Sequence, residues 1–283
     1  MGGSRLFSSS DFDAARLAAA KGAQFVSVCL PARDEEATVG AIVSTVRREL
    51  VDAVPLVDEV LVVDDGSFDA TAAVAADAGA TVVGVADVLP ACGAGRGKGN
   101  ALWKALGAAK GDLVVFCDTD VRGFDASFVT GLVGPLLADP GIGFVKGFYQ
   151  RSLDGVAGAG GRVTELVARP ALALLFPELA SVRQPIGGEM AARRAVLEQV
   201  PFVEGYGVDL GLLIDVVGRF GPEVMAEVDL GTRVHRNRPL DELAPQALVV
   251  LRTALDRAGM DMSADACVER PPIVEVEAYR RRG

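Results

Sequence analysis

The stretch Asp112-Leu-Val-Val-Phe-Cys-Asp-Thr-Asp120 joins a short, continuously apolar run to two carboxylates. A run of this kind is typical of a strand that is buried on both faces of a sheet. Similar runs occur at 25–31, 59–64 and 81–85. Stretches with helical spacing separate them, at 36–50, 69–78 and 99–109. This alternation predicts an α/β fold, in which helices cover both faces of a mostly parallel sheet.

The pattern after residue 120 is less regular. We expect strands over 142–149 and 226–235, and helices over 127–138, 164–175, 190–200, 208–220 and 240–258. A Gly/Ala-rich stretch at 155–161 favours a mobile loop. The end of the chain is basic and contains Arg270-Pro-Pro272, which predicts an extended tail.

The composition excludes several classes of protein. Asp and Glu outnumber Lys and Arg by 38 to 28, and the resulting net charge of −10 argues against general nucleic-acid binding. No apolar run is long enough to cross a membrane, and the first residues lack the layout of a signal peptide. The four cysteines form no C-x-x-C pair, and His235 is the single histidine. We therefore expect a cytoplasmic protein with free thiols and no zinc site built from several His and Cys.

Acidic clusters follow three of the expected strands. They are Pro31-Ala-Arg-Asp-Glu-Glu36, Asp64-Asp-Gly-Ser67 and Asp118-Thr-Asp120. In an open parallel sheet, ligands bind outside the carboxyl ends of the strands, at one edge. Alternate residues of an extended chain point the same way, so Asp118 and Asp120 can face one hard cation such as Mg²⁺ or Mn²⁺. An ion held there can bridge a diphosphate and stabilise it as a leaving group.

The glycine-rich stretch Gly93-Ala-Gly-Arg-Gly-Lys98 resembles a phosphate-binding loop but matches neither common motif. A P-loop requires Ser or Thr after the lysine, where this chain has Gly99. A dinucleotide-binding motif requires glycine at the position of Lys98. We interpret the stretch as an anion site formed by backbone N–H groups and Lys98 at the start of a helix.

Five stretches carry a resemblance to a known family. They are Pro31-Ala-Arg-Asp-Glu-Glu36, Gly97-Lys-Gly-Asn-Ala-Leu-Trp103, Gly161-Arg-Val-Thr-Glu-Leu-Val-Ala-Arg-Pro170, Gly205-Tyr-Gly-Val-Asp209 and His235-Arg-Asn-Arg-Pro-Leu-Asp-Glu-Leu243. In these stretches the chain resembles GT-A-fold (Rossmann-like) glycosyltransferases of the family 2 type, and more specifically actinobacterial glucosyl-3-phosphoglycerate and mannosyl-3-phosphoglycerate synthases. The resemblance implies retaining, metal-dependent transfer of a hexose from a sugar nucleotide to 3-phosphoglycerate, giving a compatible-solute precursor, and a homodimer.

The resemblance also implies roles for individual residues. The metal ligands would be Asp118, Asp120 and His235, and the residues near the transferred sugar would be Asp120, Tyr206 and Asp209. Those that hold the nucleotide would be Pro31, Glu35, Asp65, Lys98 and Asp118. Those that hold the acceptor would be Gly161, Arg162, Thr164, Arg233 and Asn237. Elementary chemistry agrees for Arg162, because a guanidinium can bind a phosphate or carboxylate through two parallel hydrogen bonds.

These roles predict three parts of the chain. Residues 1–120 would bind the sugar nucleotide, residues 121–260 would be the acceptor-binding and catalytic part of the same domain, and residues 261–283 would be the tail. The chain differs from the glucosyl enzymes at Asp34 and Asp65, where those tend to carry Asn and Ser. A carboxylate can accept hydrogen bonds from N1–H and N2–H₂ of guanine, which favours GDP-mannose as the donor.

Three alternatives stay open from the residues. The first is a glucosyl-3-phosphoglycerate synthase that uses UDP- or GDP-glucose. The second is a nucleotidyltransferase that makes sugar nucleotides; in such enzymes the glycine-rich loop usually follows the first strand directly, whereas here Pro31-Ala-Arg-Asp-Glu-Glu36 stands there. The third is a non-catalytic protein that binds sugar nucleotides, which the complete set of candidate metal ligands disfavours.

Overall fold

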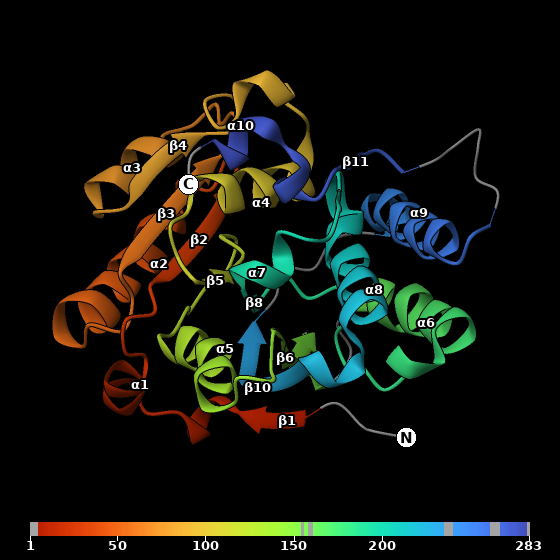
Figure 1. Cartoon of the computed structure of the whole chain (residues 1–283), viewed down its shortest axis with the longest axis horizontal. Helices are drawn as coiled ribbons and strands as arrows, with labels where there is room; N and C mark the ends of the chain where they lie inside the picture. Colours follow the sequence, from red (N-terminus) through yellow and green to blue (C-terminus); the bar gives the residue numbers. More distant parts are fainter. Residues whose placement is uncertain (1–4, 154–155, 158–160, 235–239, 261–266, 282–283) are drawn as a thin grey trace.

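A mixed but mostly parallel sheet runs through the computed structural model, which describes residues 5–153, 156–157, 161–234, 240–260 and 267–281 (Figure 1). The strand order is β1-β10-β6-β8-β5-β2-β3-β4, with β7 beside β6. Strand β8 is antiparallel to both neighbours, and the other pairs along this order are parallel. The predicted α/β fold with a mostly parallel sheet is therefore confirmed. The strands are β1 (Arg5–Ser8), β2 (Val26–Ala32), β3 (Glu59–Asp64), β4 (Thr81–Gly84), β5 (Leu113–Phe116), β6 (Phe144–Leu153), β7 (Val156–Ala157), β8 (Met190–Arg193) and β10 (Met225–Val234).

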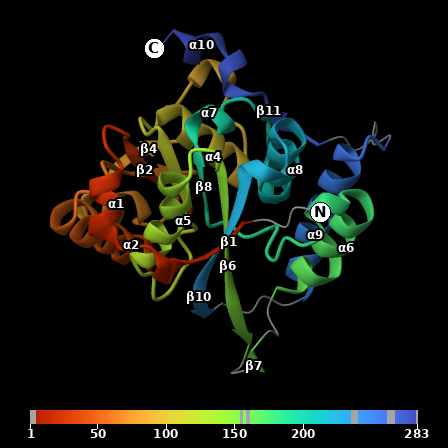
Figure 2. The same cartoon turned by 60° about the horizontal axis from the view of Figure 1, so that its bottom comes forward.

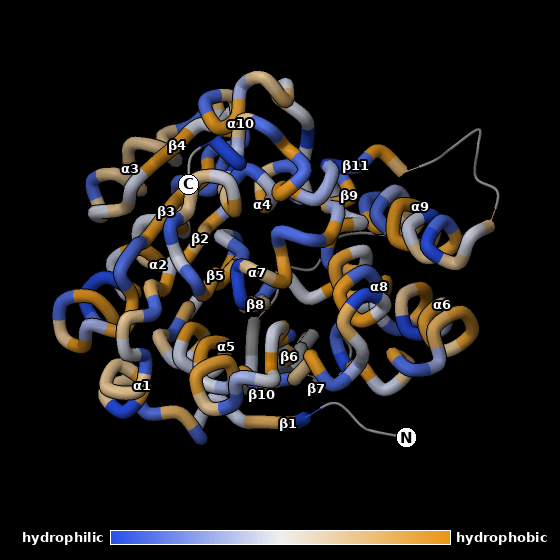
Figure 3. Tube along the Cα trace, viewed as in Figure 1, coloured by the Kyte–Doolittle hydropathy of each residue, from blue (hydrophilic) through white to orange (hydrophobic). Residues whose placement is uncertain are grey.

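Helices cover both faces of this sheet. They are α1 (Ala14–Ala20), α2 (Val39–Val46), α3 (Thr71–Asp77), α4 (Gly97–Ala108), α5 (Ser127–Ala138), α6 (Arg169–Leu175), α7 (Arg194–Leu197), α8 (Val208–Phe220), α9 (Leu240–Arg257) and α10 (Glu277–Arg280). Alternate residues of β3 face different layers: Val60 and Val62 belong to the core cluster that includes residues of α2 and α5, whereas Leu61 and Val63 belong to the one that includes residues of α4 and α8. Hydrophobic and hydrophilic residues alternate along α9, which packs against α6 and α8, as expected of a helix with one buried face (Figure 3). Within the described ranges, no helix combines the length and the apolarity needed to cross a membrane.

One predicted helix is wrong. The stretch 190–200 forms strand β8 and the short helix α7 instead. Ala191 and Ala192 favour a helix locally, but β8 fills the gap between β5 and β6 and supplies both with hydrogen-bonding partners. A short apolar run does not distinguish a buried strand from a buried helix by periodicity, so tertiary pairing decides here.

The end of the chain also differs from the expected extended tail. Strand β11 (Glu269–Arg270) pairs antiparallel with β9 (Phe202–Val203), and Ile273 is fully buried. The indole N–H of Trp103 in α4 donates a hydrogen bond to the carbonyl of Pro271 over 2.9 Å. In Figure 1, α10 and β11 accordingly lie at the same end of the molecule as α4. The described part of the tail, 267–281, is thus packed against the domain.

Candidate active site

The carboxyl ends of β2, β3 and β5 meet at one edge of the sheet. Strand β2 lies between β3 and β5, and the chain reaches β5 only after it has formed β3 and β4. The strand order therefore reverses between β2 and β5, which is where open α/β sheets bind ligands. The hydroxyl of Thr119 donates to the carbonyl of Pro31 over 2.8 Å and ties the two strand ends together. This edge carries the three acidic clusters of the sequence.

Lys98 joins two carboxylates at this edge. Its Nζ lies 2.8 Å from Oδ1 of Asp118 and 3.0 Å from Oδ2 of Asp209. The first carboxylate follows β5 and the second lies in the first turn of α8, so the three groups come from distant parts of the chain. Burial alone would lower the pKa of Lys98, but the carboxylates of Asp118 and Asp209 raise it well above its usual value. Lys98 therefore stays positively charged throughout the physiological pH range.

Asp209 is the most buried member of this cluster, with only 4% of its side chain exposed. Burial raises the pKa of its carboxyl group, and the positive charges of Lys98 and Lys146 oppose that rise. Its Oδ1 is buried and has no hydrogen-bond partner in the part of the chain that the structure describes. An unsatisfied buried acceptor costs about 1–3 kcal/mol, so this atom is suited to receive a hydrogen bond from a ligand hydroxyl.

Two further buried charges lie close to this cluster, and the sequence reasoning missed both. Lys146 in β6 is 1% exposed and donates a hydrogen bond to the carbonyl of Gly187, and Glu189, just before β8, is fully buried. Burial lowers the pKa of Lys146, while the charges of Asp209 and Glu189 oppose that effect. A single lysine inside the apolar run 142–149 was the available signal for Lys146. Glu189 gave no signal, because it precedes a stretch that we expected to be helical.

Gly188 approaches Asp118 so closely that a side chain there has no room. A Cβ atom at this position would lie 2.3 Å from Oδ1 of Asp118. Lys146 holds the carbonyl of the preceding residue, Gly187. The turn before β8 therefore helps to fix the position of the Asp118 carboxylate.

The remaining candidates for the sugar and the metal lie in more open positions. Asp120 is exposed at the end of the Asp118-Thr-Asp120 stretch, and 49% of Tyr206 is exposed. Both carboxylates after β5 offer the hard oxygen ligands that Mg²⁺ and Mn²⁺ prefer. Among the described residues, no group of three or more His, Cys, Asp or Glu is arranged to hold a metal ion. The third candidate ligand, His235, lies outside those residues.

The candidate acceptor residues are only partly described. Thr164 is 3% exposed, and its Oγ1 is another buried atom that has no hydrogen-bond partner within the described ranges. Gly161 has a φ of +81°, and Arg162 next to it is partly exposed. The backbone of Arg233 lies in β10, one of two long strands that reach past the rest of the sheet (Figure 2). Asn237, the side chain of Arg233 and part of the stretch 155–161 lie outside what the structure describes.

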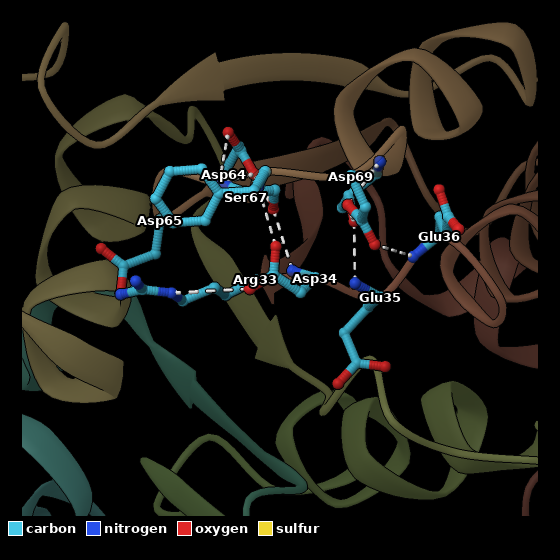
Figure 4. A network of polar contacts seen from close by, with 10 residues as sticks. Arg33, Asp34, Glu35, Glu36, Asp64, Asp65, Ser67 and Asp69 are labelled. Atoms are coloured by element: carbon cyan, nitrogen blue, oxygen red, sulfur yellow. Dashed lines mark hydrogen bonds and ion pairs between the residues drawn. The ribbon is translucent and has the colours of Figure 1, made fainter.

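The side chain of Asp34 is engaged by neighbouring loops. Its Oδ1 accepts a hydrogen bond from the N–H of Phe68 over 2.8 Å, and its own N–H donates to Oγ of Ser67 over 3.0 Å. Its Oδ2 lies 3.9 Å from Nε of Arg33. Figure 4 shows the two loops, after β2 and after β3, joined in this way. One carboxylate oxygen of Asp34 therefore accepts a hydrogen bond from the loop after β3, while Oδ2 takes part only in an exposed ion pair.

The loop after β2 has two more links to the loop after β3. The N–H of Glu35 donates to Oγ1 of Thr71 over 2.7 Å. Glu36 donates its N–H to Oδ2 of Asp69 and accepts from the N–H of Ala70 through Oε2, over 3.2 and 2.9 Å. These reciprocal bonds fix the backbone of both loops around the candidate nucleotide residues.

Asp65 points toward the glycine-rich loop. It accepts a hydrogen bond from the backbone N–H of Gly97, and its Oδ2 lies 4.0 Å from Nη1 of Arg33. Burial raises the pKa of this carboxyl group, and the Arg33 guanidinium opposes the rise. The structure thus brings Asp65 and Lys98 to the same edge, with Gly97 between them.

Comparison with known proteins agrees with this arrangement. The family model for glycosyl transferase family 2 matches residues 27–200. A glucosyl-3-phosphoglycerate synthase from Mycolicibacterium paratuberculosis is 50% identical over 253 residues, which cover 87% of this chain and 76% of that protein. The enzyme of the same name from Petrotoga mobilis is 39% identical over 287 residues, covering 91% of this chain and 88% of that protein.

Solved structures give the same result. The crystal structure of glucosyl-3-phosphoglycerate synthase from Mycobacterium tuberculosis with Mn²⁺, UDP-glucose and phosphoglyceric acid superimposes with a TM-score of 0.88 at 44% identity, covering 96% of this chain and 98% of that one. A structure of that enzyme with Mg²⁺ and UDP has a TM-score of 0.87 at 43% identity, covering 96% of this chain and 99% of that one. These relatives support the alternative of a glucosyl-3-phosphoglycerate synthase rather than the predicted preference for GDP-mannose as the donor.

Proposed function

The chain belongs to glycosyl transferase family 2, and from this premise we propose that it transfers glucose from UDP-glucose to 3-phosphoglycerate, with Mg²⁺ or Mn²⁺ bound. The observation that carries the proposal is the convergence of Lys98, Asp118 and Asp209 at the edge where the strand order reverses. These groups form one charged cluster beside the glycine-rich loop, where a divalent cation bound by the carboxylates would stabilise a departing nucleoside diphosphate.

In this proposal the nucleotide lies over the loops after β2 and β3. Glu35 and Asp65 are held there by the hydrogen bonds of the two loops and of Gly97. Pro31, at the end of β2, lies beside them. The rigid loops fix the base and ribose, while the backbone of the glycine-rich loop faces the diphosphate.

The metal ion would be held by Asp118, Asp120 and His235. When bound, it would neutralise charge on the departing diphosphate. Lys98 adds a permanent positive charge from the protein, since its carboxylate neighbours keep it ionised. Its ion pair with Asp118 places that charge directly beside the first of the proposed ligands.

The sugar would lie against Asp209 and Tyr206. A hexose hydroxyl can donate to the unsatisfied Oδ1 of Asp209, while Oδ2 stays with Lys98. Tyr206 is exposed enough to contact a sugar, and it lies three residues before Asp209. This arrangement orients the anomeric carbon relative to the diphosphate that leaves it.

The acceptor would lie on the face of the anomeric carbon from which the diphosphate departs. Arg162 and the unsatisfied hydroxyl of Thr164 would bind its phosphate or carboxylate, with Gly161 allowing close approach of the backbone. Arg233 and Asn237 complete the proposed acceptor set. The single hydroxyl of 3-phosphoglycerate would attack the anomeric carbon from the face that the diphosphate leaves, so that the configuration is retained. As the new C–O bond forms and the bond to the diphosphate breaks, the hydroxyl proton would pass to the departing diphosphate oxygen.

Three broader expectations also stay proposals: the division into nucleotide part, acceptor part and tail, a cytoplasmic location, and a homodimer. Exposed leucines on neighbouring helices support the dimer, because Leu166 and Leu174 are 73% and 81% exposed and Leu248 in α9 is 56% exposed. Sedimentation of the wild type against Leu174→Asp would test it. Loss of a dimer in the variant is expected, and a monomeric wild type would contradict the proposal.

One assay tests the proposed function directly. The protein is incubated with 3-phosphoglycerate, Mg²⁺ or Mn²⁺ and, in separate reactions, UDP-glucose, GDP-glucose and GDP-mannose. The products are identified by mass and by digestion with glycosidases of known specificity. We expect glucosyl-3-phosphoglycerate with UDP-glucose as the best donor. Faster formation of mannosyl-3-phosphoglycerate from GDP-mannose would show that the proposed donor is wrong.

A further inference from the structure

Arg270 lies between two loops of the candidate site. It belongs to the C-terminal strand β11, and 12% of its side chain is exposed. Its Nε is 3.0 Å from Oδ1 of Asn100 in α4 and 3.0 Å from Oε1 of Glu204. Its Nη1 donates to the carbonyl of Cys92, before the glycine-rich loop. Its guanidinium also lies over the ring of Trp103, 5.5 Å from the centroid. A single side chain thus contacts both loops.

The glycine-rich loop depends on these contacts for its position. Asn100, which Arg270 holds by Oδ1, donates through Nδ2 to the carbonyl of Ala94 over 2.8 Å. Gly95 packs so tightly that a Cβ atom there would lie 2.0 Å from Nη2 of Arg270. Lys98 follows Ala94 by four residues and lies in the first turn of α4, directly after the glycine-rich loop. The guanidinium therefore packs against the segment that carries the proposed diphosphate-binding groups and fixes its position through hydrogen bonds.

The second loop leads to Tyr206 and Asp209. It starts at Glu204, whose N–H donates to the carbonyl of Val268 in the C-terminal segment over 2.8 Å. The two loops touch directly, since a Cβ atom at Gly97 would lie 3.0 Å from the Cα atom of Gly205. A shift of either loop would therefore change the 3.0 Å contact between Lys98 and Asp209.

We propose that Arg270 is a positioning residue for glucosyl transfer. From the C-terminal segment, it fixes the glycine-rich loop before Lys98 relative to the loop before Asp209. The proposal rests on the proposed function only in naming what the two loops bind. Arg270 touches neither the donor nor the acceptor in this arrangement. Its effect reaches the reaction through Asn100 and Glu204.

The neighbouring residue Glu269 offers a matched control. It lies in the same short strand and accepts a hydrogen bond from Nη2 of Arg257, in α9. This ion pair also ties the C-terminal segment to the domain, but on the side away from the glycine-rich loop. Glu269→Ala therefore loosens the segment without removing a contact to either loop, whereas Arg270→Ala removes contacts to both.

The test compares wild type, Arg270→Ala, Arg270→Lys, Glu204→Gln and Glu269→Ala. Hydrogen–deuterium exchange of the peptide 90–99 reports the loop itself, and calorimetry with UDP and Mn²⁺ reports nucleotide binding. Steady-state kinetics give the KM values of both substrates. For Arg270→Ala we expect at least tenfold faster exchange in 90–99, about tenfold weaker UDP binding and an unchanged KM for 3-phosphoglycerate.

The other variants separate positioning from stability. Arg270→Lys keeps the charge and should recover part of the UDP affinity, and Glu204→Gln should weaken it in the same direction as Arg270→Ala. Glu269→Ala should lower the melting temperature and leave UDP affinity within twofold. If Arg270→Ala and Glu204→Gln leave both exchange and UDP affinity within twofold of the control, Arg270 is not a positioning residue. A wild type that transfers no glucose would refute the proposed function instead, while the exchange comparison would still decide the role of Arg270.

Discussion

The nucleotide side and the acceptor side of the candidate site are built differently. On the nucleotide side, hydrogen bonds between the loops after β2 and β3 use the polar groups of Asp34 and Glu36. On the proposed acceptor side, the hydroxyl of Thr164 is buried and has no hydrogen-bond partner among the described residues, and the same holds for Oδ1 of Asp209, where the two sides meet. One side is therefore preorganised by hydrogen bonds between its loops, and the other holds buried polar atoms that a ligand can satisfy.

This difference predicts how each side contributes to the affinity and the selectivity of ligand binding. A preorganised loop loses little conformational entropy when the nucleotide binds, so its contacts appear directly as affinity. A buried polar atom without a partner already carries its desolvation cost in the free protein. A ligand that provides a hydrogen bond removes that cost, and a ligand that lacks the matching group does not. The acceptor side should therefore be the more selective of the two toward small changes in its ligand.

The largest expected effect lies where the two sides meet, at the proposed metal site. Asp120→Ala should lower kcat by about three orders of magnitude or more, because the diphosphate would leave without full charge compensation. Chelation with EDTA should abolish transfer by the wild type, and Mg²⁺ or Mn²⁺ should restore it. Full activity in EDTA would rule out the metal assignment. Asp125→Ala, an exposed carboxylate five residues further along, is the control and should keep wild-type kinetics.

The next effect tests the acceptor side alone. Arg162→Ala should raise the KM for 3-phosphoglycerate at least tenfold, which corresponds to about 1.4 kcal/mol. The Kd for UDP should stay within twofold, because the nucleotide side is held by its own hydrogen bonds. Arg169→Ala serves as the control, since Arg169 pairs on the surface with Glu165. A variant that loses UDP affinity but keeps its acceptor KM would show that we have divided the site wrongly.

A smaller effect is expected at Thr164. Thr164→Val keeps the shape of the side chain and removes the hydroxyl, so a ligand would lose one hydrogen bond, about 1 kcal/mol or roughly fivefold in the KM for 3-phosphoglycerate. The free protein should become no less stable, because the hydroxyl has no hydrogen-bond partner to lose among the described residues. Thermal unfolding and kinetics measured together check both halves. A variant with a clearly lower melting temperature and an unchanged KM would mean that the hydroxyl serves the fold.

The sequence predicted the bounds of several elements well, but not the long-range contacts and buried charges of the candidate site. Strand β3 and helices α5 and α8 have the predicted bounds, because each is an apolar stretch ended by acidic residues or glycine. The acidic clusters at the strand ends meet as the parallel sheet requires. The partners of Arg270 were beyond reach, since it lies 170 residues from Asn100 and nothing local marks a contact of that separation. Periodicity likewise could not place Lys146 and Glu189, because a single charge in an apolar run has no period.

The smallest expected effect concerns the base of the donor. It tests whether the Asp34 carboxylate, which already accepts a hydrogen bond from Phe68, also contacts that base. Asn at position 34 can still accept from the N–H of Phe68, and it tolerates the φ of +56° found there. Asp34→Asn should therefore change the ratio of UDP to GDP affinity by less than about twofold, a difference of about 0.4 kcal/mol. Asp65→Ala is the informative partner, because it removes the acceptor of the Gly97 N–H at the start of α4, and this loss should weaken both nucleotides together. Calorimetry with UDP and GDP in the presence of Mn²⁺ measures both variants. A tenfold shift toward UDP in Asp34→Asn alone would mean that this carboxylate contacts the base despite its bonds to the neighbouring loop, and a guanine donor would regain its physical basis.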